Sequence, residues 1–177
     1  MSIRPGVPSD ATILAGFAAR VFNEAFGQEN RASDMEAHLA ASYGEDQQGR
    51  ELRDPSCVTL LIEDGGRLIA FAQVRQHQPP LCVTGEAPIE LYRFYVDRPW
   101  HGQGIAQWLM AAAQETARDL GGGTLWLTVW ERNPRAIAFY TKCGYRDVGA
   151  TDFFVGPDRQ VDRILVIDVV DQVSDAT

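Results

Sequence analysis

Apolar residues recur with a helical spacing in the first third of the chain and with strand-like patterns further on. One apolar face near the start is made by Ile13, Leu14, Phe17, Val21 and Phe22. This spacing predicts an amphipathic helix that begins after Ser9, a residue typical of N-caps. Ser33 and Glu36 form a capping-box pattern, which predicts that a second helix begins there and runs to Tyr43. A third, short helix is expected over residues 45–53.

The later apolar stretches are short and rich in β-branched and aromatic residues, as is typical of strands. Residues 57–63 and 67–76 are predicted to form a hairpin around Asp64-Gly65-Gly66, which is a strong turn signal. A second antiparallel pair is expected around Gly156-Pro157-Asp158. Together with a short strand at Ile3-Arg4, the remaining predicted strands cover 89–97, 124–130, 145–155 and 161–170.

A long amphipathic helix is predicted between the strands at 89–97 and 124–130, and Gly121-Gly122-Gly123 ends it. Its apolar face consists of Ile105, Ala106, Leu109, Met110, Ala113, Ala117 and Leu120. Because a helix connects them, the two strands should lie parallel with a right-handed crossover. The pattern therefore predicts an α/β fold with a mixed, mostly antiparallel sheet of about seven strands and about four flanking helices.

The length of the chain limits the number of domains, and its net charge limits the kinds of partner that it can bind. The 177 residues suffice for one domain with a real core but not comfortably for two, so we expect one domain over 1–172 and a frayed tail over 173–177. Hydrophobic residues make up 45% and charged residues 23%, as in ordinary globular proteins. The net charge of −8 repels nucleic acid phosphates and attracts cations. We therefore expect no nucleic acid partner, and a cationic substrate fits this charge.

The sequence carries no membrane, targeting or metal signal. No apolar run approaches the roughly 18 residues that a membrane span needs. The first residues lack the basic-then-apolar pattern of a signal peptide, so we expect a cytoplasmic protein without a membrane partner. Cys57, Cys82 and Cys143 are widely spaced and the three histidines are scattered, which predicts neither a disulfide framework nor a bound metal.

The turn between the strand at 89–97 and the long helix contains Gly102 and Gly104. Glycines that open a helix let unpaired backbone N–H groups converge on an anion without Cβ atoms in the way. The helix dipole adds about half a positive charge at the same end. This turn is therefore predicted to bind a phosphate group.

Two common phosphate-binding motifs do not fit this turn. A P-loop closes with Gly-Lys-Ser/Thr, which is missing here. A dinucleotide-binding fingerprint would need Gly or Ala three residues after Gly104, where Gln107 stands. It would also need an acidic residue at the end of the next strand, and 124–130 contains none.

The turn instead resembles the pyrophosphate loop Gln/Arg-x-x-Gly-x-Gly/Ala of the GCN5-related N-acetyltransferases. Its six positions are His101, Gly102, Gln103, Gly104, Ile105 and Ala106, with His101 where Gln or Arg is usual. Residues 130–145 resemble the family's Asn-x-x-Ala-x-x-Phe-Tyr-x-x-x-Gly-Phe segment, with Tyr145 for the final Phe. The resemblance implies that the two central parallel strands splay apart and that acetyl-CoA lies in the opening.

The resemblance also implies roles for individual residues. Backbone amides near Tyr95 and Val96 would hold the pantetheine arm and polarise the thioester carbonyl, and Tyr140 would donate a hydrogen bond to the departing thiolate. Asn133 is expected to cap the helix that follows it, to contact the pantetheine arm or to do both, and Lys142 is expected to contact a CoA phosphate. The expected acetyl-CoA site comprises Tyr95, Val96, His101, Gly102, Gln103, Gly104, Ile105, Ala106, Asn133, Tyr140 and Lys142.

An amine acceptor needs a proton acceptor, because a primary ammonium has a pKa of about 10.4. Glu90, on the strand at 89–97, is the predicted base, either directly or through a chain of water molecules. Tyr140 and Glu90 are therefore the expected catalytic residues.

The resemblance extends to the PaiA branch of the family, which acetylates spermidine and spermine. It is carried by segments 22–26, 92–96 and 153–162, together with Asp34, Met35 and Leu39. A polyamine carries three or four positive charges, which suits an acidic protein. The expected acceptor contacts are Glu24, Asp34, Glu36 and Glu90.

Other functions stay open at this point. The acceptor could be a peptide or protein amine, an aminoglycoside or another small amine, because this superfamily changes its acceptor pocket while keeping the CoA site. A CoA-binding regulatory module without turnover is a further alternative, favoured only by His101 and the unproven base. Exposed strand edges in this fold make a homodimer an additional possibility.

Overall fold

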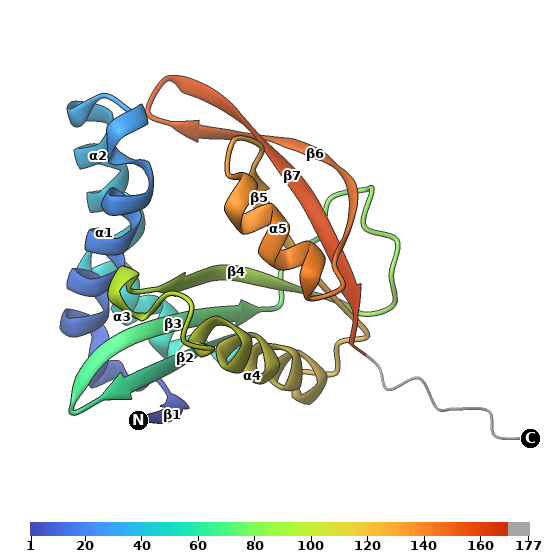
Figure 1. The fold of residues 1–177 in the computed structure, drawn as a ribbon, viewed down its shortest axis with the longest axis horizontal. Coiled ribbons are helices and arrows are strands. Elements are labelled where there is room, and N and C mark those ends of the chain that lie inside the picture. Colours follow the sequence, from blue (N-terminus) through green and yellow to red (C-terminus); the bar gives the residue numbers. More distant parts are fainter. Residues whose placement is uncertain (170–177) are drawn as a thin grey trace, which may run out of the picture.

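A seven-stranded sheet organises residues 1–169, which are the residues that the computed structural model describes (Figure 1). The strand order is β1-β2-β3-β4-β5-β7-β6. The strands are β1 (Ser2–Pro5), β2 (Cys57–Asp64), β3 (Arg67–Arg75), β4 (Pro88–Val96), β5 (Thr124–Trp130), β6 (Arg146–Val155) and β7 (Asp158–Asp168). The helices are α1 (Ala11–Phe26), α2 (Ala32–Tyr43), α3 (Glu45–Arg53), α4 (Ile105–Asp119) and α5 (Pro134–Lys142). The single-turn 3₁₀ helices are η1 (Pro8–Asp10), η2 (Gly27–Glu29) and η3 (Arg98–Trp100). This arrangement confirms the predicted fold class.

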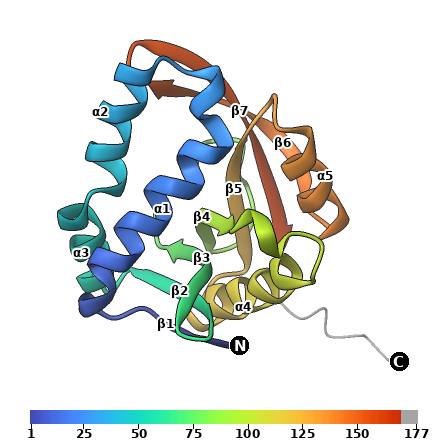
Figure 2. The same ribbon diagram turned by 60° about the vertical axis from the view of Figure 1, so that its left-hand side comes forward.

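Helices cover both faces of the sheet (Figure 2). On one face, Phe17 of α1 packs edge-on against Phe71 of β3, with ring centroids 6.0 Å apart, in a cluster that includes Leu61. On the other face, Leu109 of α4 packs in a cluster that includes Leu60. Leu60 and Leu61 are neighbours in β2 and point to opposite faces, as the two-residue period of a strand requires. Each helical layer therefore has its own core.

The central parallel pair is short. β4 and β5 pair only from Pro88–Glu90 to Thr124–Trp126 in the described chain. Beyond these positions β4 continues to Val96 beside β3, whereas β5 continues to Trp130 beside β7. The two strands thus diverge, and a gap opens between their backbones (Figure 1).

A bulge in β4 lies next to this divergence. Val74 pairs with Leu91 and Gln73 pairs with Arg93, so Tyr92 is an extra residue on β4. A bulge interrupts the ladder and bends the strand. It therefore bends β4 just beyond the last residue that pairs with β5.

The hairpin of β6 and β7 reaches across to the α1–α2 connection. Gln160 Nε2 in β7 donates a hydrogen bond to Asn30 Oδ1, at 2.8 Å. Phe153 in β6 lies edge-on to the His38 ring of α2, with centroids 5.7 Å apart. These contacts join the first and last parts of the chain around the gap between β4 and β5.

Two helix starts differ from the sequence prediction. α1 begins at Ala11 after η1, because the Asp10 carboxylate accepts hydrogen bonds from the Val7 amide and from Arg4; Ser9 is not its N-cap. α2 begins at Ala32 with Arg31 as its N-cap, and no side chain caps it. The capping-box prediction at Ser33 was therefore wrong. The predicted tail at 173–177 lies outside the described residues.

Candidate functional site

A cavity of about 870 Å³ occupies the space where β4 and β5 diverge, and we call it the cleft. One wall, the α5 side, comes from the turn before α4 and from the start of α5. The opposite wall, the α1 side, comes from α1, α2, β6 and β7. Sequence-predicted site residues that line the cleft are Glu24, Glu90, Tyr95, Val96, His101, Gly102, Gly104, Ala106, Asn133 and Tyr140.

The glycine turn at the α5 side has the geometry of an anion cradle. Gly102 and Gly104 adopt φ angles of 79° and 83°, which side chains rarely tolerate. The first hydrogen bond of the helix runs from the Trp108 amide to the Gly104 carbonyl, at 3.0 Å. The amides of residues 102–107 have no backbone acceptor in the described chain, so they are available to a ligand. These features fit a diphosphate.

His101, which replaces the usual Gln or Arg, ties the turn to the end of β4. Its Nε2 donates a hydrogen bond to the carbonyl oxygen of Val96, at 2.8 Å. The imidazole therefore has a structural partner within the loop. This hydrogen bond holds the glycine turn against the end of β4, where the backbone amides predicted to bind the pantetheine arm lie.

The α5 side also has three arginines that the sequence analysis did not predict, namely Arg98, Arg132 and Arg135. They supply positive charge near the cradle, as an anionic ligand requires. Lys142, the predicted phosphate contact, is an exposed residue at the end of α5 outside the lining. Gln103, whose Nε2 donates to the Pro99 carbonyl, and the buried Ile105 also lie outside the lining.

Tyr140 combines a buried ring with a position in the cleft wall. Its side chain is 8% exposed and lies edge-on to the rings of Phe94 and Tyr145, at 6.2 and 5.6 Å. Burial raises the pKa of Tyr140 well above its usual range, so the phenol keeps its proton at neutral pH. No group in the described chain forms a hydrogen bond with its hydroxyl. The phenol is therefore a proton donor available to a ligand.

Asn133 holds the start of α5. Its Oδ1 accepts a hydrogen bond from the Ala136 amide, at 3.1 Å, and it precedes Pro134 at the first helical position. The capping alternative is confirmed. Because Asn133 also lines the cleft, a contact with a ligand remains compatible with this bond.

The predicted acidic residues fall into two groups. Glu24 and Glu90 line the cleft, but each is paired: Glu24 accepts from Arg20 at 3.0 Å, and Glu90 accepts from Arg75 Nε at 2.5 Å. Asp34 and Glu36 do not line it in the described structure. Glu36 borders a separate hollow of about 430 Å³ between α1 and α2. Asp34 lies against Gly156 in the β6–β7 turn. These two positions therefore do not support acceptor contacts in the cleft.

The α1 side has an aromatic lining that sequence reasoning missed. Phe22 stacks on His38 at 4.9 Å and Phe26 lies edge-on to Trp130 at 6.0 Å. Burial, followed by the charge of Arg93, lowers the pKa of His38, so this ring is neutral at pH 7. Aromatic faces attract cations, so this wall suits an ammonium group on an alkyl chain.

Asp162 is a further residue that the sequence analysis did not place in the site. It lines the cleft from β7 and is 6% exposed. Asp162, Ile164 and Val166 lie on one face of β7, because residues two apart in a strand point the same way. A carboxylate in line with buried apolar residues was therefore the sequence signal that could have identified Asp162.

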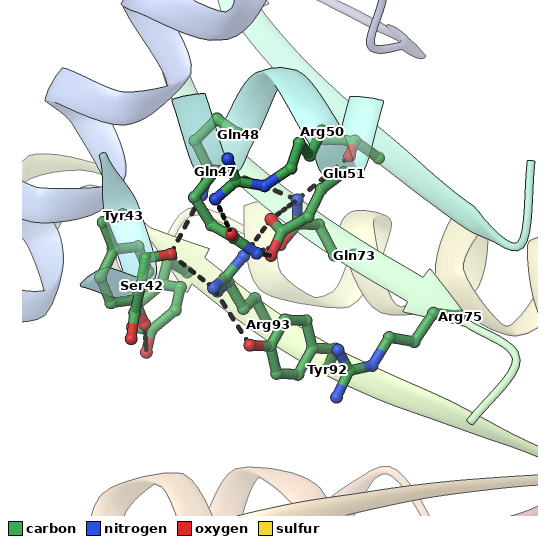
Figure 3. A network of polar contacts seen from close by, with 12 residues as sticks. Ser42, Tyr43, Gln47, Gln48, Arg50, Glu51, Gln73, Arg75, Tyr92 and Arg93 are labelled. Carbon is green, nitrogen blue, oxygen red and sulfur yellow. Dashed lines mark hydrogen bonds and ion pairs between the residues drawn. The ribbon is translucent and has the colours of Figure 1, made fainter. Parts of the chain in front are cut away.

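A buried arginine network supports β4 at the wall of the cleft (Figure 3). Arg93, 4% exposed, forms an ion pair with Glu51 of α3 and donates to Gln73 Oε1 at 2.6 Å and to the Ser42 carbonyl at 2.7 Å. Its guanidinium also stacks on Tyr92, 4.3 Å from the ring centroid. Because Arg93 follows the bulge directly, the network fixes the bulged strand to α2 and α3.

Replacing Gly104 by alanine is expected to weaken acetyl-CoA binding about tenfold, because a Cβ at φ 83° costs about 1–2 kcal/mol and turns the amides away from the ligand. Gly65→Ala is the matched control, since Gly65 also has positive φ but lies in the β2–β3 turn. Isothermal calorimetry should show the affinity loss only in Gly104→Ala. Equal affinities for the two variants would contradict the cradle.

The chain is similar in sequence to known acetyltransferases. The model of the acetyltransferase (GNAT) family matches residues 20–145. An uncharacterized N-acetyltransferase of Mycobacterium bovis is 32% identical over 167 residues, which cover 92% of this chain and 99% of that protein. An aminoglycoside N(6')-acetyltransferase type 1 of Stenotrophomonas maltophilia is 25% identical over 157 residues, covering 88% and 93%.

A solved structure shows the same fold. The PaiA N-acetyltransferase of Thermoplasma acidophilum, determined in complex with coenzyme A, superimposes with a TM-score of 0.72 at 17% identity, covering 95% of this chain and 99% of that one. Within residues 1–169, no helix is both long enough and apolar enough to cross a membrane. The same residues contain no group of three or more His, Cys, Asp or Glu side chains placed to hold a metal ion.

Proposed function

Because the chain belongs to the acetyltransferase (GNAT) family, we propose that it transfers the acetyl group of acetyl-CoA directly to a primary amine of a polyamine such as spermidine or spermine. Family membership makes the chain an N-acetyltransferase with acetyl-CoA as cosubstrate. The acceptor is inferred from the chemistry of the cleft.

One observation carries the proposal: a single cleft joins an anion cradle at one wall to an acidic and aromatic wall opposite. The glycine turn and Arg98, Arg132 and Arg135 suit the phosphates of acetyl-CoA. The divergence of β4 from β5 leaves backbone groups of Tyr95 and Val96 without a partner strand on that side, so they can bind amides of the pantetheine arm. The thioester would then lie between the two walls.

We assign the Tyr140 hydroxyl as the hydrogen-bond donor to the CoA sulfur. Its phenol is protonated at neutral pH, and it is not bonded to another group in the described chain. A hydrogen bond to the sulfur strengthens as negative charge develops there, so it stabilises the transition state more than the bound substrate. Asn133 would fix the start of α5 and so the position of Tyr140, which lies about two turns further along this helix.

The α1 side favours a slender cationic acceptor. The carboxylates of Glu24 and Asp162 and the aromatic rings of Phe22 and Phe26 line it, and Glu90 of β4 and Trp130 of β5 line the same cleft. Carboxylates attract ammonium groups, and aromatic faces bind both cations and methylene chains. A polyamine offers both features along its length.

The direct test is incubation of the protein with acetyl-CoA and a panel of amines, followed by thiol release and mass analysis of the product. We expect spermidine and spermine to give the fastest release and a singly acetylated product. The panel includes an aminoglycoside, because of the relative from Stenotrophomonas maltophilia, and a peptide with a free α-amine. Faster turnover of either one would reject the polyamine assignment. Binding of CoA without release for any amine would favour a regulatory module.

A further inference from the structure

Asp162 is a buried carboxylate with one unsatisfied oxygen, and the group that hydrogen-bonds to it, the Thr128 hydroxyl, is uncharged. It is 6% exposed, and its Oδ1 has no hydrogen-bond partner among the described residues. A buried carboxylate is costly unless it is paired or hydrogen-bonded. An unpaired one at the wall of a cleft is therefore a candidate for binding a cation that the cleft receives.

The neighbours of Asp162 in the sheet do not neutralise it. Asp162 pairs with Trp130 of β5 and with Thr151 of β6, and neither carries a charge. The next residue, Arg163, points its guanidinium at Asp147, with an N–O distance of 2.7 Å. Arg163 and Asp147 thus pair with each other, and Arg163 does not neutralise the charge of Asp162.

The other carboxylates of the cleft are already paired. Glu90 accepts from Arg75, which also stacks over the Tyr92 ring at 3.4 Å from its centroid, and Glu24 accepts from Arg20. An ammonium group that enters the cleft therefore finds uncompensated negative charge at Asp162. Asp162 lies on β7, in the wall opposite the glycine turn. The acceptor amine is expected to approach the thioester from this side.

We propose that, if the chain transfers acetyl groups to an amine as proposed above, the Asp162 carboxylate binds the acceptor's ammonium group and takes its proton. Asp162 then replaces Glu90 as the general base. Glu90, held by Arg75, contributes charge to the wall without accepting the proton.

The protonation behaviour of Asp162 agrees with this role. Burial raises the pKa of Asp162 to about 6, and the Thr128 hydroxyl opposes the rise in part. A carboxylate with this pKa is ionised at pH 7 and is a stronger base than an ordinary aspartate. The other ionisable groups that line the cleft from α1, α2 and β4 are Glu24, His38, Tyr43, Glu90, Tyr92, Arg93 and Tyr95.

The reaction balances with these groups alone. A proton leaves the ammonium nitrogen for Asp162, which gives a neutral amine and a carboxylic acid. The amine lone pair forms the N–C bond to the thioester carbonyl carbon, and the C–S bond breaks with its electrons on sulfur. The second proton of the amine reaches sulfur through the Tyr140 hydroxyl, and Asp162 returns its proton to solvent. The products are an amide, a free thiol and one proton.

The test compares Asp162→Asn with Glu90→Gln and with Asp152→Asn, in which the lost carboxylate is an exposed β6 residue paired with Arg159. We expect Asp162→Asn to lower kcat/KM for spermidine at pH 7 about a hundredfold. The fall of kcat/KM below about pH 6, which is the acid limb of its pH profile, should disappear in this variant, and the affinity for acetyl-CoA should stay unchanged. Asp152→Asn should match the unmodified protein. Asp162→Ser serves as the second variant if the asparagine protein does not fold.

Each outcome decides between the two proposals. If the unmodified protein turns over and Asp162→Asn stays within threefold of it with the acid limb intact, the assignment of Asp162 is wrong. If Glu90→Gln alone removes the acid limb, Glu90 is the base. If the unmodified protein acetylates no amine, the proposed function fails, and calorimetry with spermidine in the presence of CoA still tests Asp162. A tenfold loss of spermidine affinity in Asp162→Asn supports ammonium binding, and equal affinity overturns it.

Discussion

Replacing Tyr140 by phenylalanine is expected to lower kcat for acetyl transfer about a hundredfold, which is the low end of the range for proton-transfer groups. The change removes only the hydroxyl, and the ring keeps its contacts with Phe94 and Tyr145. The affinity for acetyl-CoA should stay nearly constant, because the hydrogen bond matters most when charge develops on sulfur. Steady-state kinetics and calorimetry measure the two quantities separately.

Tyr145→Phe is the matched control for this variant. Tyr145 is also a buried tyrosine, but its hydroxyl donates to the sulfur of Met110, at 3.4 Å, and it does not line the cleft. Its loss should leave kcat within about twofold, since a weak hydrogen bond to sulfur contributes little. An undiminished rate in Tyr140→Phe, or equal losses in the two variants, would remove the assigned role of Tyr140.

Replacing Arg93 by methionine is expected to lower the free energy of unfolding by about 3–5 kcal/mol, because it leaves the buried Glu51 carboxylate without its charge partner. Methionine keeps much of the volume, so the loss reports charge and hydrogen bonds more than packing. The Gln73 side chain and the Ser42 carbonyl also lose a donor (Figure 3). Urea unfolding of the two proteins gives the difference.

An exposed pair on the other side of the sheet provides the control. Arg163 and Asp147 form an ion pair with both side chains well exposed, so Arg163→Met should cost at most about 1 kcal/mol. The double variant Arg93→Met, Glu51→Leu should recover part of the loss, since it removes both charges. If Arg93→Met costs no more than Arg163→Met, the network does not stabilise β4 as described.

The sequence predicted those parts of the fold that depend on local pattern. The strand at 124–130 and the long helix from Ile105 follow from apolar spacing and from the glycines around them. The glycine turn was also predictable, because Gly102 and Gly104 are tied to a specific backbone conformation. The start of α2 was not, because Ser33 and Glu36 have the right spacing for a capping box but the N-cap is Arg31, two residues before Ser33.

The composition of the site depended on contacts between distant residues. Glu90 was expected as a base, but its pairing with Arg75 arises only from the β3–β4 register. Asp162 lacks a charged partner because the uncharged residues Trp130 and Thr151 lie beside it on β5 and β6, which the sequence does not reveal. Arg132 and Arg135 enter the cleft wall because α5 begins there.

A crystal structure of the protein with coenzyme A tests the central claim most directly. We predict the diphosphate on the amides of residues 102–106, at the start of α4. The pantetheine arm should lie between β4 and β5, with the sulfur within hydrogen-bond distance of the Tyr140 hydroxyl. A coenzyme bound elsewhere, or a sulfur remote from Tyr140 with the diphosphate off the glycine turn, would contradict the account.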